Sequence, residues 1–264
     1  MPSLYQISAV AIAVAYFVAM TIAQAAGIHF GALSARRSSD RAAGGFSAVS
    51  AAVLALLGLL LAFTFSMAAT RYEVRRIRLI QETNAAGTVY LRADLVAEPA
   101  RSAIKEAVRG FVQSRIDFHG AGANVAASAE ARASTAAYQD AIWKAVVEEC
   151  RREPQTVRMT TVIQAANDLF DTAAAHTASY QEHVADTIIW LLFAVAATSA
   201  LLIGYTDGLT GSRSRLAALA FNCTMMLVVY AILDLDRPRR GLIRIDLAPM
   251  TELRDQLSDR IGNG

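Results

Sequence analysis

The chain has 264 residues, of which 55% are hydrophobic and 18% are charged, and its formal net charge is +2. Soluble domains are about 45–50% apolar, so the hydrophobic fraction and the mean hydropathy of +0.35 argue against an ordinary soluble protein. The small net charge argues against nucleic-acid binding, and the two cysteines are too few for a disulfide framework.

Four uncharged stretches contain the hydrophobic excess, and each is long enough to cross a bilayer, which needs about 20 apolar helical residues. The stretches are residues 4–26, 48–69, 187–206 and 216–233. The first could be a signal peptide, but no basic residue precedes it, and its apolar run exceeds the about 7–15 residues of a signal sequence. We therefore predict an all-α membrane protein with four transmembrane helices.

A long polar segment separates the second and third spans, and we expect it to form a helical cytoplasmic domain. Apolar residues recur at helical spacing through residues 71–95, so the second transmembrane helix should continue out of the membrane. Further helices are expected over residues 99–118, over 128–153, and after Pro154 without a break into the third span. The predicted domains are residues 1–70 (first two spans), 71–186 (helical domain), 187–235 (last two spans) and 236–264 (cytoplasmic C-terminal tail).

Arginines near the ends of the spans predict the orientation, because cytoplasmic loops carry an excess of Lys and Arg. The larger group is Arg71, Arg75, Arg76, Arg78, Arg237, Arg239, Arg240 and Arg244; the opposite group is Arg36, Arg37, Arg41, Arg213 and Arg215. We therefore predict a multi-pass protein of the cell (inner) membrane with the central domain and both termini in the cytoplasm. The arginines of the first loop would reverse this orientation if the first span alone set it.

We find no motif that carries enzyme chemistry, and we expect no catalytic residue, no cofactor and no metal site. His176 and His183 are seven residues apart and could share a helical face near Asp168 and Glu182. The sequence has no HExxH motif, phosphate-binding glycine loop or nucleophile elbow. A solvated helix surface is the more economical interpretation of these histidines.

Three arginines form a stripe where the second span leaves the membrane. Arg71, Arg75 and Arg78 recur at i, i+4 and i+7 on one helical face. The arginines could contact lipid phosphates, but in an oligomer around an axis they would form cationic rings that select for anions. The pore-lining candidates are Thr64, Met67, Ala68, Arg71, Arg75 and Arg78, and the constriction candidates are Phe63 and Phe65.

Two carboxylates follow the fourth span directly. Asp234 and Asp236 should lie near the membrane boundary, where an unpaired charge is costly. We therefore predict a structural ion pair between Asp234 or Asp236 and the arginine group that includes Arg71.

Three motifs resemble a family of bacterial and plant membrane proteins known as bestrophin-like domain proteins. The motifs are residues 58–66 (GLLLAFTFS, followed by Arg71-Tyr72), residues 82–92 (ETNAAGTVYLR) and residues 233–241 (LDLDRPRRG). The resemblance implies kinship with bestrophins, which are homo-oligomeric anion channels with a large cytoplasmic helical domain and a pore lined by the second transmembrane helix. Here that helix would correspond to residues 54–78, in which Thr64 and Ser66 could equally form a cation pathway.

The sequence and the resemblance together predict a homo-oligomeric membrane ion channel, with anions favoured by the arginine stripe. A cation channel of the same architecture is one alternative. A non-conducting membrane scaffold or sensor, which binds a partner through its cytoplasmic helices, is the other. The expected partners are further copies of the chain, membrane lipid and the permeant ion, and no nucleic acid.

Overall fold

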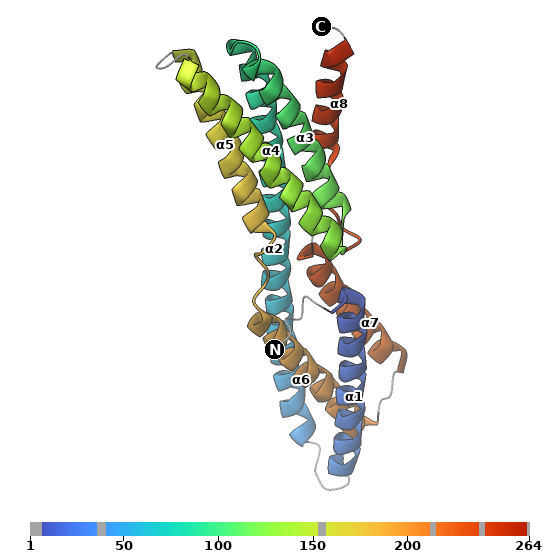
Figure 1. Cartoon of the computed structure of the whole chain (residues 1–264). Coiled ribbons are helices and arrows are strands. Elements are labelled where there is room, and N and C mark those ends of the chain that lie inside the picture. The colour runs from blue at the N-terminus through green and yellow to red at the C-terminus, as the bar shows by residue number, and fades with distance from the viewer. Residues whose placement is uncertain (1–6, 36–40, 153–156, 212–214, 238–240, 263–264) are drawn as a thin grey trace. The chain divides into compact units, whose positions relative to one another are not determined.

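The structure is a computed structural model, and it describes residues 7–35, 41–152, 157–211, 215–237 and 241–262. The regular elements of these residues are helices, and no strand occurs among them. The helices are α1 (Ala9–Ala35), α2 (Arg41–Arg92), α3 (Ala100–Gly120), α4 (Val125–Arg152), α5 (Val157–Ser179), α6 (Asp186–Thr210), α7 (Arg215–Leu235) and α8 (Ala248–Gly262), with a 3-10 turn, η2, at Ala93–Leu95 (Figure 1).

The chain divides into two compact units. Unit 1 comprises Met1–Thr70, His183–Arg237 and Gly241–Ile243, and unit 2 comprises Arg71–Glu182, Pro238–Arg240 and Arg244–Gly264. The helix α2 runs for 52 residues without a break and contributes to both units. Because Arg41–Arg92 contains no proline, nothing in this segment forces the backbone out of helical geometry. The prediction that the helix of the second span continues far beyond it is confirmed.

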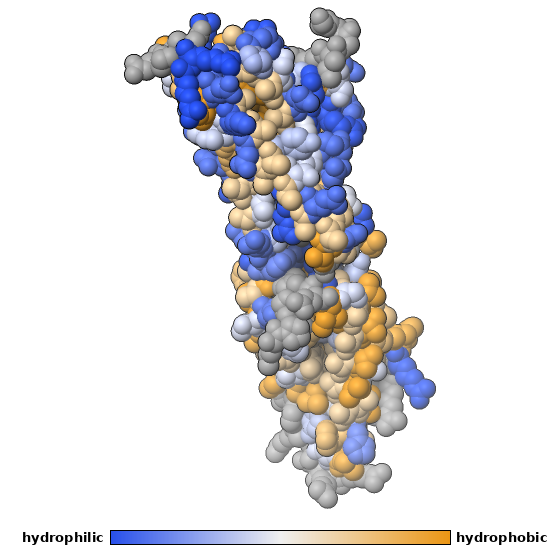
Figure 2. Space-filling model, in the orientation of Figure 1, coloured by the Kyte–Doolittle hydropathy of each residue, from blue (hydrophilic) through white to orange (hydrophobic). Residues whose placement is uncertain are grey.

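Four of the described helices, α1, α2, α6 and α7, are long and apolar enough to cross a membrane. Many of their large apolar side chains point away from the chain, including Val14, Ile22, Phe63, Trp190 and Leu227. Figure 2 shows apolar residues over much of the surface of unit 1, whereas the surface of unit 2 is mainly polar. An apolar surface of this extent suits lipid rather than water. The prediction of an all-helical, multi-pass membrane protein is therefore confirmed.

Glycines bring the backbones of α1 and α6 into direct contact. The close positions are Gly27, Gly31, Gly204 and Gly208. A Cβ atom at Gly27 would lie 2.8 Å from the backbone nitrogen of Tyr205, and one at Gly204 would overlap the carbonyl oxygen of Gln24. Each helix therefore presents two glycines four residues apart, a spacing that permits close helix packing in membranes.

Buried amides join α1 to α7. The Nδ2 atom of Asn222 donates to Oε1 of Gln24 at 3.0 Å and lies 3.4 Å from Oγ1 of Thr21. Gln24 and Asn222 are both buried. Side-chain hydrogen bonds of this kind hold membrane helices together where apolar burial cannot, because lipid is as apolar as the helix interface.

Asp234 organises the backbone that follows α7. Its carboxylate accepts hydrogen bonds from the backbone N–H groups of Leu242 and Ile243, at 3.1 and 2.8 Å. A Cβ atom at Gly241 would lie 2.8 Å from the Oδ2 atom of Asp234, so a larger residue here would displace the Asp234 carboxylate. The Asp234 and Gly241 positions of the 233–241 motif therefore have a structural explanation.

Asp236 performs a similar task at the start of α6. Its Oδ2 atom accepts from the backbone N–H of Val184 at 2.8 Å, in the segment that leads into the third span. The same oxygen lies 3.8 Å from Nδ1 of the half-buried His183. Asp236 thus fixes the end of α7 to the segment that precedes α6.

Unit 2 packs the second part of α2 with α3, α4, α5 and α8 around one hydrophobic core. Each helix contributes buried side chains, for example Val89, Phe111, Ile142, Leu169 and Met250 in chain order. The helix α8 presents Met250, Leu253 and Leu257 at spacings of three and four residues, and these side chains belong to the same core. The C-terminal tail therefore contains a packed helix that we did not predict.

Two other predictions require comment. The helix after Pro154 does not run unbroken into the third span: α5 ends at Ser179, a turn follows at Tyr180–Gln181, and α6 begins at Asp186. The break is stable because side chains distant in sequence bind backbone groups that no helix satisfies. For example, the carboxylate of Asp236 accepts a hydrogen bond from the backbone N–H of Val184. The positions of Pro154, Arg36, Arg37, Arg213, Arg239 and Arg240, on which parts of the helix and orientation predictions depend, lie outside the described residues.

Substitution of a contact glycine should separate α1 from α6. In Gly204→Ala the new methyl group overlaps backbone atoms that cannot move independently, so we expect the free energy of unfolding to fall by about 1–3 kcal/mol. Gly58→Ala is the matched control, because a Cβ atom at Gly58 meets no neighbouring atom within 4 Å. Unfolding of the full chain in detergent measures both, and equal effects would contradict the proposed contact.

Candidate pore helix and buried polar network

One side of α2 is buried along most of its length. We call this side the inner face; its residues are Leu57, Leu61, Thr64, Ala68, Arg75, Leu79, Glu82, Ala86 and Val89. The spacing alternates between three and four residues, with Arg71 in the gap between Ala68 and Arg75. A repeat averaging about 3.5 residues keeps one side of a helix against its neighbours. The inner face is therefore the packing surface of α2.

Three of the predicted pore-lining residues belong to the inner face. Thr64, Ala68 and Arg75 are 2%, 0% and 1% exposed. The hydroxyl group of Thr64 donates to the carbonyl oxygen of Leu60 at 2.7 Å, within the helix itself. Side chains enclosed by their own chain reach a pore between several copies only if the chain repacks. Burial therefore counts against these three residues as pore lining.

Arg75 binds the C-terminal end of α5. Its Nε atom donates to the carbonyl oxygen of Ser179 at 3.1 Å, and its Nη2 atom donates to that of Glu182 at 2.6 Å. The last carbonyl groups of a helix lack partners within the helix, and a cation there also interacts favourably with the helix dipole. Arg75 thus supplies the hydrogen bonds that end α5 and hold it against α2.

The other predicted pore and constriction residues lie outside the inner face or are partly exposed. Met67 is 36% exposed, Arg71 and Arg78 are half-buried, and Phe63 and Phe65 are exposed. Their roles in a pore stay predictions. The ion pair of Asp234 or Asp236 with Arg71 also stays a prediction, while both carboxylates bind the backbone N–H groups described above.

The opposite side of α2 has a different character. We call it the outer face; its residues are Ala48, Ala55, Leu59, Ala62, Ser66, Thr70 and Glu73, all of them exposed. Ser66 is two residues from both Thr64 and Ala68, which places it about half a turn away from the inner face. Except for Leu59, the outer face carries small or hydroxyl-bearing side chains before Glu73. Glu73 is paired with Arg76 at 3.0 Å on the exposed surface.

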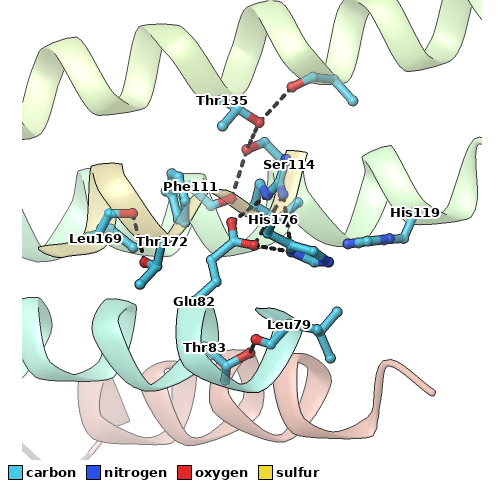
Figure 3. A network of polar contacts seen from close by, with 12 residues as sticks. Leu79, Glu82, Thr83, Phe111, Ser114, His119, Thr135, Leu169, Thr172 and His176 are labelled. Atoms are coloured by element: carbon cyan, nitrogen blue, oxygen red, sulfur yellow. Dashed lines mark hydrogen bonds and ion pairs between the residues drawn. The ribbon is translucent and has the colours of Figure 1, made fainter. Parts of the chain in front are cut away.

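Unit 2 contains a fully buried group of charged and polar side chains (Figure 3). Glu82 of α2 faces Arg115 of α3, whose Nε lies 2.5 Å from Oε1 and whose Nη2 lies 3.1 Å from Oε2. The Nδ1 atom of His176, on α5, binds the same Oε2. Three helices therefore meet at one carboxylate, to which Nη2 of Arg115 donates a hydrogen bond while Nε of Arg115 makes a close charge contact.

The protonation of Glu82 follows from its surroundings. Burial alone would raise the pKa of Glu82, but the hydrogen bond from His176 and the charge of Arg115 outweigh burial and hold the pKa below its ordinary value of 4.5. Glu82 is therefore ionised at neutral pH. Its contribution to stability is present above the ordinary pKa and is lost as the pH falls through the lowered pKa of the folded state.

A chain of hydrogen bonds leads away from this carboxylate. The Nε2 atom of His176 lies 3.1 Å from the hydroxyl oxygen of Tyr180, which lies 3.1 Å from Nδ1 of His119. His176 is completely buried, whereas His119, at the end of α3, is half-buried. The Glu82–Arg115–His176–Tyr180–His119 network is named the buried polar network below.

The network corrects the interpretation of the histidines. The sequence predicted His176 on a solvated helix surface, which is wrong, because the side chain is buried against Glu82 and Arg115. His176 and His183 also do not share a helical face, since α5 ends at Ser179 between them. Within the described residues, no group of three or more His, Cys, Asp or Glu side chains could hold a metal ion.

Sequence reasoning missed Glu82 and Arg115 as partners. Glu82 belongs to the 82–92 motif and lies seven residues after Arg75, so it falls on the same helical stripe as the arginines that we singled out. An acidic residue that continues a stripe of arginines is the signal that could have identified Glu82 as buried. Nothing in the spacing of α3 indicates that Arg115 reaches it.

Comparison with known proteins gives one match. A family model described as "Bestrophin-like domain" matches residues 15–250 of the chain, which is most of its length. No curated protein and no solved structure matches the chain.

Removal of the buried carboxylate should destabilise the protein strongly. Glu82→Ala leaves Arg115 buried without its partner, and we expect a loss of about 3–5 kcal/mol in the free energy of unfolding. The control Glu73→Ala breaks an exposed pair with Arg76 and should cost less than about 1 kcal/mol. Denaturation of the full chain in detergent measures both variants. A Glu82→Ala protein no less stable than Glu73→Ala would contradict the assigned ion pair.

Proposed function

Because the chain belongs to the Bestrophin-like domain family, we propose that it is a homo-oligomeric ion channel whose pore is lined by the outer face of α2. The observation that carries the proposal is the contrast between the two faces of this helix. The inner face is enclosed by the chain's own helices, and the outer face exposes small residues and hydroxyl groups along the membrane-spanning part.

Lipid alone does not account for the outer face. A helix side that contacts acyl chains gains from large apolar residues, as the exposed Val14, Val18 and Ile22 of α1 illustrate. The outer face of α2 instead presents Ser66 within the second span and Thr70 directly after it. Small and hydroxyl-bearing side chains leave room around an axis and offer oxygen atoms to a permeant ion. Further copies of the chain, with the outer faces of α2 turned toward each other, complete such a pathway.

The outer face favours cations over anions. The sequence-based preference for anions depended on the arginine stripe, but Arg75 is occupied with the carbonyl groups of Ser179 and Glu182. On the outer face the first charged residue after the span is Glu73, which stays exposed while it pairs with Arg76. Rings of carboxylates attract cations, and hydroxyl oxygens replace part of their hydration shell. We therefore propose a cation pathway, and the anion pathway becomes the alternative that a flux measurement distinguishes.

Leu59 is the proposed constriction. It lies on the outer face between Ala55 and Ala62, is 53% exposed, and is the large apolar residue of that row. A ring of leucines narrows a pore and can close it by excluding water. Phe63 and Phe65, the constriction candidates from the sequence, lie on the flanks of the outer face, where they would contact lipid or a neighbouring copy.

The proposed location is the cell (inner) membrane with unit 2 and both termini in the cytoplasm. This orientation rests on the dense arginines that follow the second span, such as Arg71, Arg76 and Arg78, because basic residues near span ends stay on the cytoplasmic side. We further propose that the half-buried Arg71 and Arg78 contact lipid phosphates.

Thiol modification distinguishes the two faces of α2. In a Cys150→Ser, Cys223→Ala background, Ser66→Cys and Thr70→Cys should react with a charged thiol reagent and lose most of their ion flux in liposomes. The matched controls Thr64→Cys and Ala68→Cys carry the thiol on the buried inner face and should keep their flux. Block at Thr64 and Ala68 but not at Ser66 and Thr70 would contradict the assignment. No flux in either a chloride or a potassium gradient, from a folded oligomer, would favour the non-conducting scaffold.

The carboxylate at the mouth should set the ion preference. Glu73→Gln removes the charge from the outer face, and we expect the ratio of potassium flux to chloride flux to fall several-fold. The control Glu148→Gln removes an equally exposed carboxylate from α4, where Glu148 pairs with Arg152 at 2.9 Å. Unchanged ratios in both variants would remove Glu73 from the pathway, and a wild-type protein that conducts chloride better would restore the anion alternative.

A further inference from the structure

We propose that the side-chain amides of Gln24 and Asn222 bind a water molecule between α1 and α7, and that this water bridges Nε2 of Gln24 to Oδ1 of Asn222. The site belongs to unit 1 and involves helices other than α2. It therefore does not rest on the proposed function.

The two amides lie deep in the part of the chain that spans the membrane. Gln24 and Asn222 are 4% and 2% exposed. About 22 Å of helix separates Gln24 from the start of α1 at Ala9, and about 16 Å separates it from the end at Ala35. Asn222 reaches the same depth, because its Nδ2 atom donates to Oε1 of Gln24 at 3.0 Å. Within a bilayer core a polar group at this depth needs a partner in the interior of the protein.

The direct bond leaves one donor and one acceptor of the pair unsatisfied. The Nδ2 atom of Asn222 donates to Gln24 and lies 3.4 Å from Oγ1 of Thr21. The Nε2 atom of Gln24 carries two hydrogens, and the Oδ1 atom of Asn222 is an acceptor. Neither of these two atoms forms a hydrogen bond with any atom of the described residues. Unsatisfied groups of both kinds therefore lie on the same two side chains.

Rotation of the amide groups does not remove this deficit. If both groups turn by half a rotation, Gln24 becomes the donor of the direct bond, and its carbonyl oxygen and the NH2 group of Asn222 are left over instead. If only one group turns, two NH2 groups or two carbonyl oxygens face each other across the 3.0 Å contact, which is repulsive. Each arrangement with a direct bond leaves one donor and one acceptor for a further partner.

The partner has to lie on the side of Gln24 that faces α7. On the side that faces α6, the backbones are in direct contact, since a Cβ atom at Gly204 would overlap the carbonyl oxygen of Gln24. That contact leaves no room for another molecule. Toward α7, the two helices meet through the side chains of Gln24 and Asn222, whose unsatisfied atoms belong to the same contact.

Water has the chemistry that the pair requires. The bound molecule has to accept a hydrogen bond from Nε2 of Gln24 and donate one to Oδ1 of Asn222. Acyl chains do neither, and the ester groups of lipids can only accept. A buried water molecule typically makes about 2–4 hydrogen bonds to groups that would otherwise be unsatisfied. The bridge adds a second link between α1 and α7 beside the direct bond, and a water-mediated bond is nearly as favourable in enthalpy as a direct one.

Solid-state NMR of the full chain in lipid bilayers tests the site, because magnetisation that starts on water reaches the nearest hydrogens first. The side-chain NH2 signals are assigned through the backbone of their own residues. We expect transfer from water to the NH2 group of Gln24 to be several-fold faster than transfer to the backbone N–H of Ala196, which is 0% exposed on α6 of the same unit. Transfer to Gln24 that is no faster than transfer to Ala196 would overturn the proposal.

Replacement of the acceptor tests the bridge. Asn222→Leu removes Oδ1 and places an apolar side chain beside Gln24, so transfer from water to Gln24 should fall several-fold. Tyr16→Phe is the matched control, because it removes a different buried polar group of α1 that forms no hydrogen bond with the described residues. The control should leave transfer to Gln24 unchanged. Undiminished transfer in Asn222→Leu, or an equal loss in Tyr16→Phe, would contradict a water that bridges the two amides.

Discussion

The burial of the inner face of α2 is the constraint on which the rest of the structure depends. A single helix of 52 residues supplies inner-face residues to both units. The inner face includes Leu57 and Leu61 in unit 1 and Leu79, Ala86 and Val89 in unit 2. Because the inner face is buried within the chain, only the opposite side of α2 remains available to other copies of the chain or to lipid.

The charged residues Arg75 and Glu82 on the inner face join helices of the same chain. The sequence had instead predicted that Arg75 lines a pore. Arg75 ends α5, and Glu82 gathers α3 and α5 around one carboxylate. A buried charge that loses its partner costs about 3–5 kcal/mol, so these contacts specify how the helices of unit 2 meet. The membrane helices use other means, namely glycine contacts between α1 and α6 and the Asn222–Gln24 amide bond.

Much of the fold could be predicted from the sequence. Uncharged stretches of sufficient length indicated the four apolar helices, and the absence of proline indicated the continuous α2. The break after Ser179 could not be predicted, because Arg75 and Asp236, both distant in sequence, bind its backbone groups. Whether the arginine stripe faces the interior of the chain or its surface could not be predicted from the sequence either. Spacing shows that Arg71, Arg75 and Arg78 share a face, but only packing shows that Arg75 points inward.

The central claim is that the outer face of α2 lies toward further copies of the chain. Cross-linking between copies in native membranes tests this claim most directly. Each variant carries one introduced cysteine in a chain whose own cysteines are removed by Cys150→Ser and Cys223→Ala. Oxidation should join copies that carry Ala62→Cys, on the outer face, and should leave copies with Ala68→Cys, on the inner face, as single chains. Cross-linking through Ala68 with none through Ala62 would contradict the assignment of the two faces.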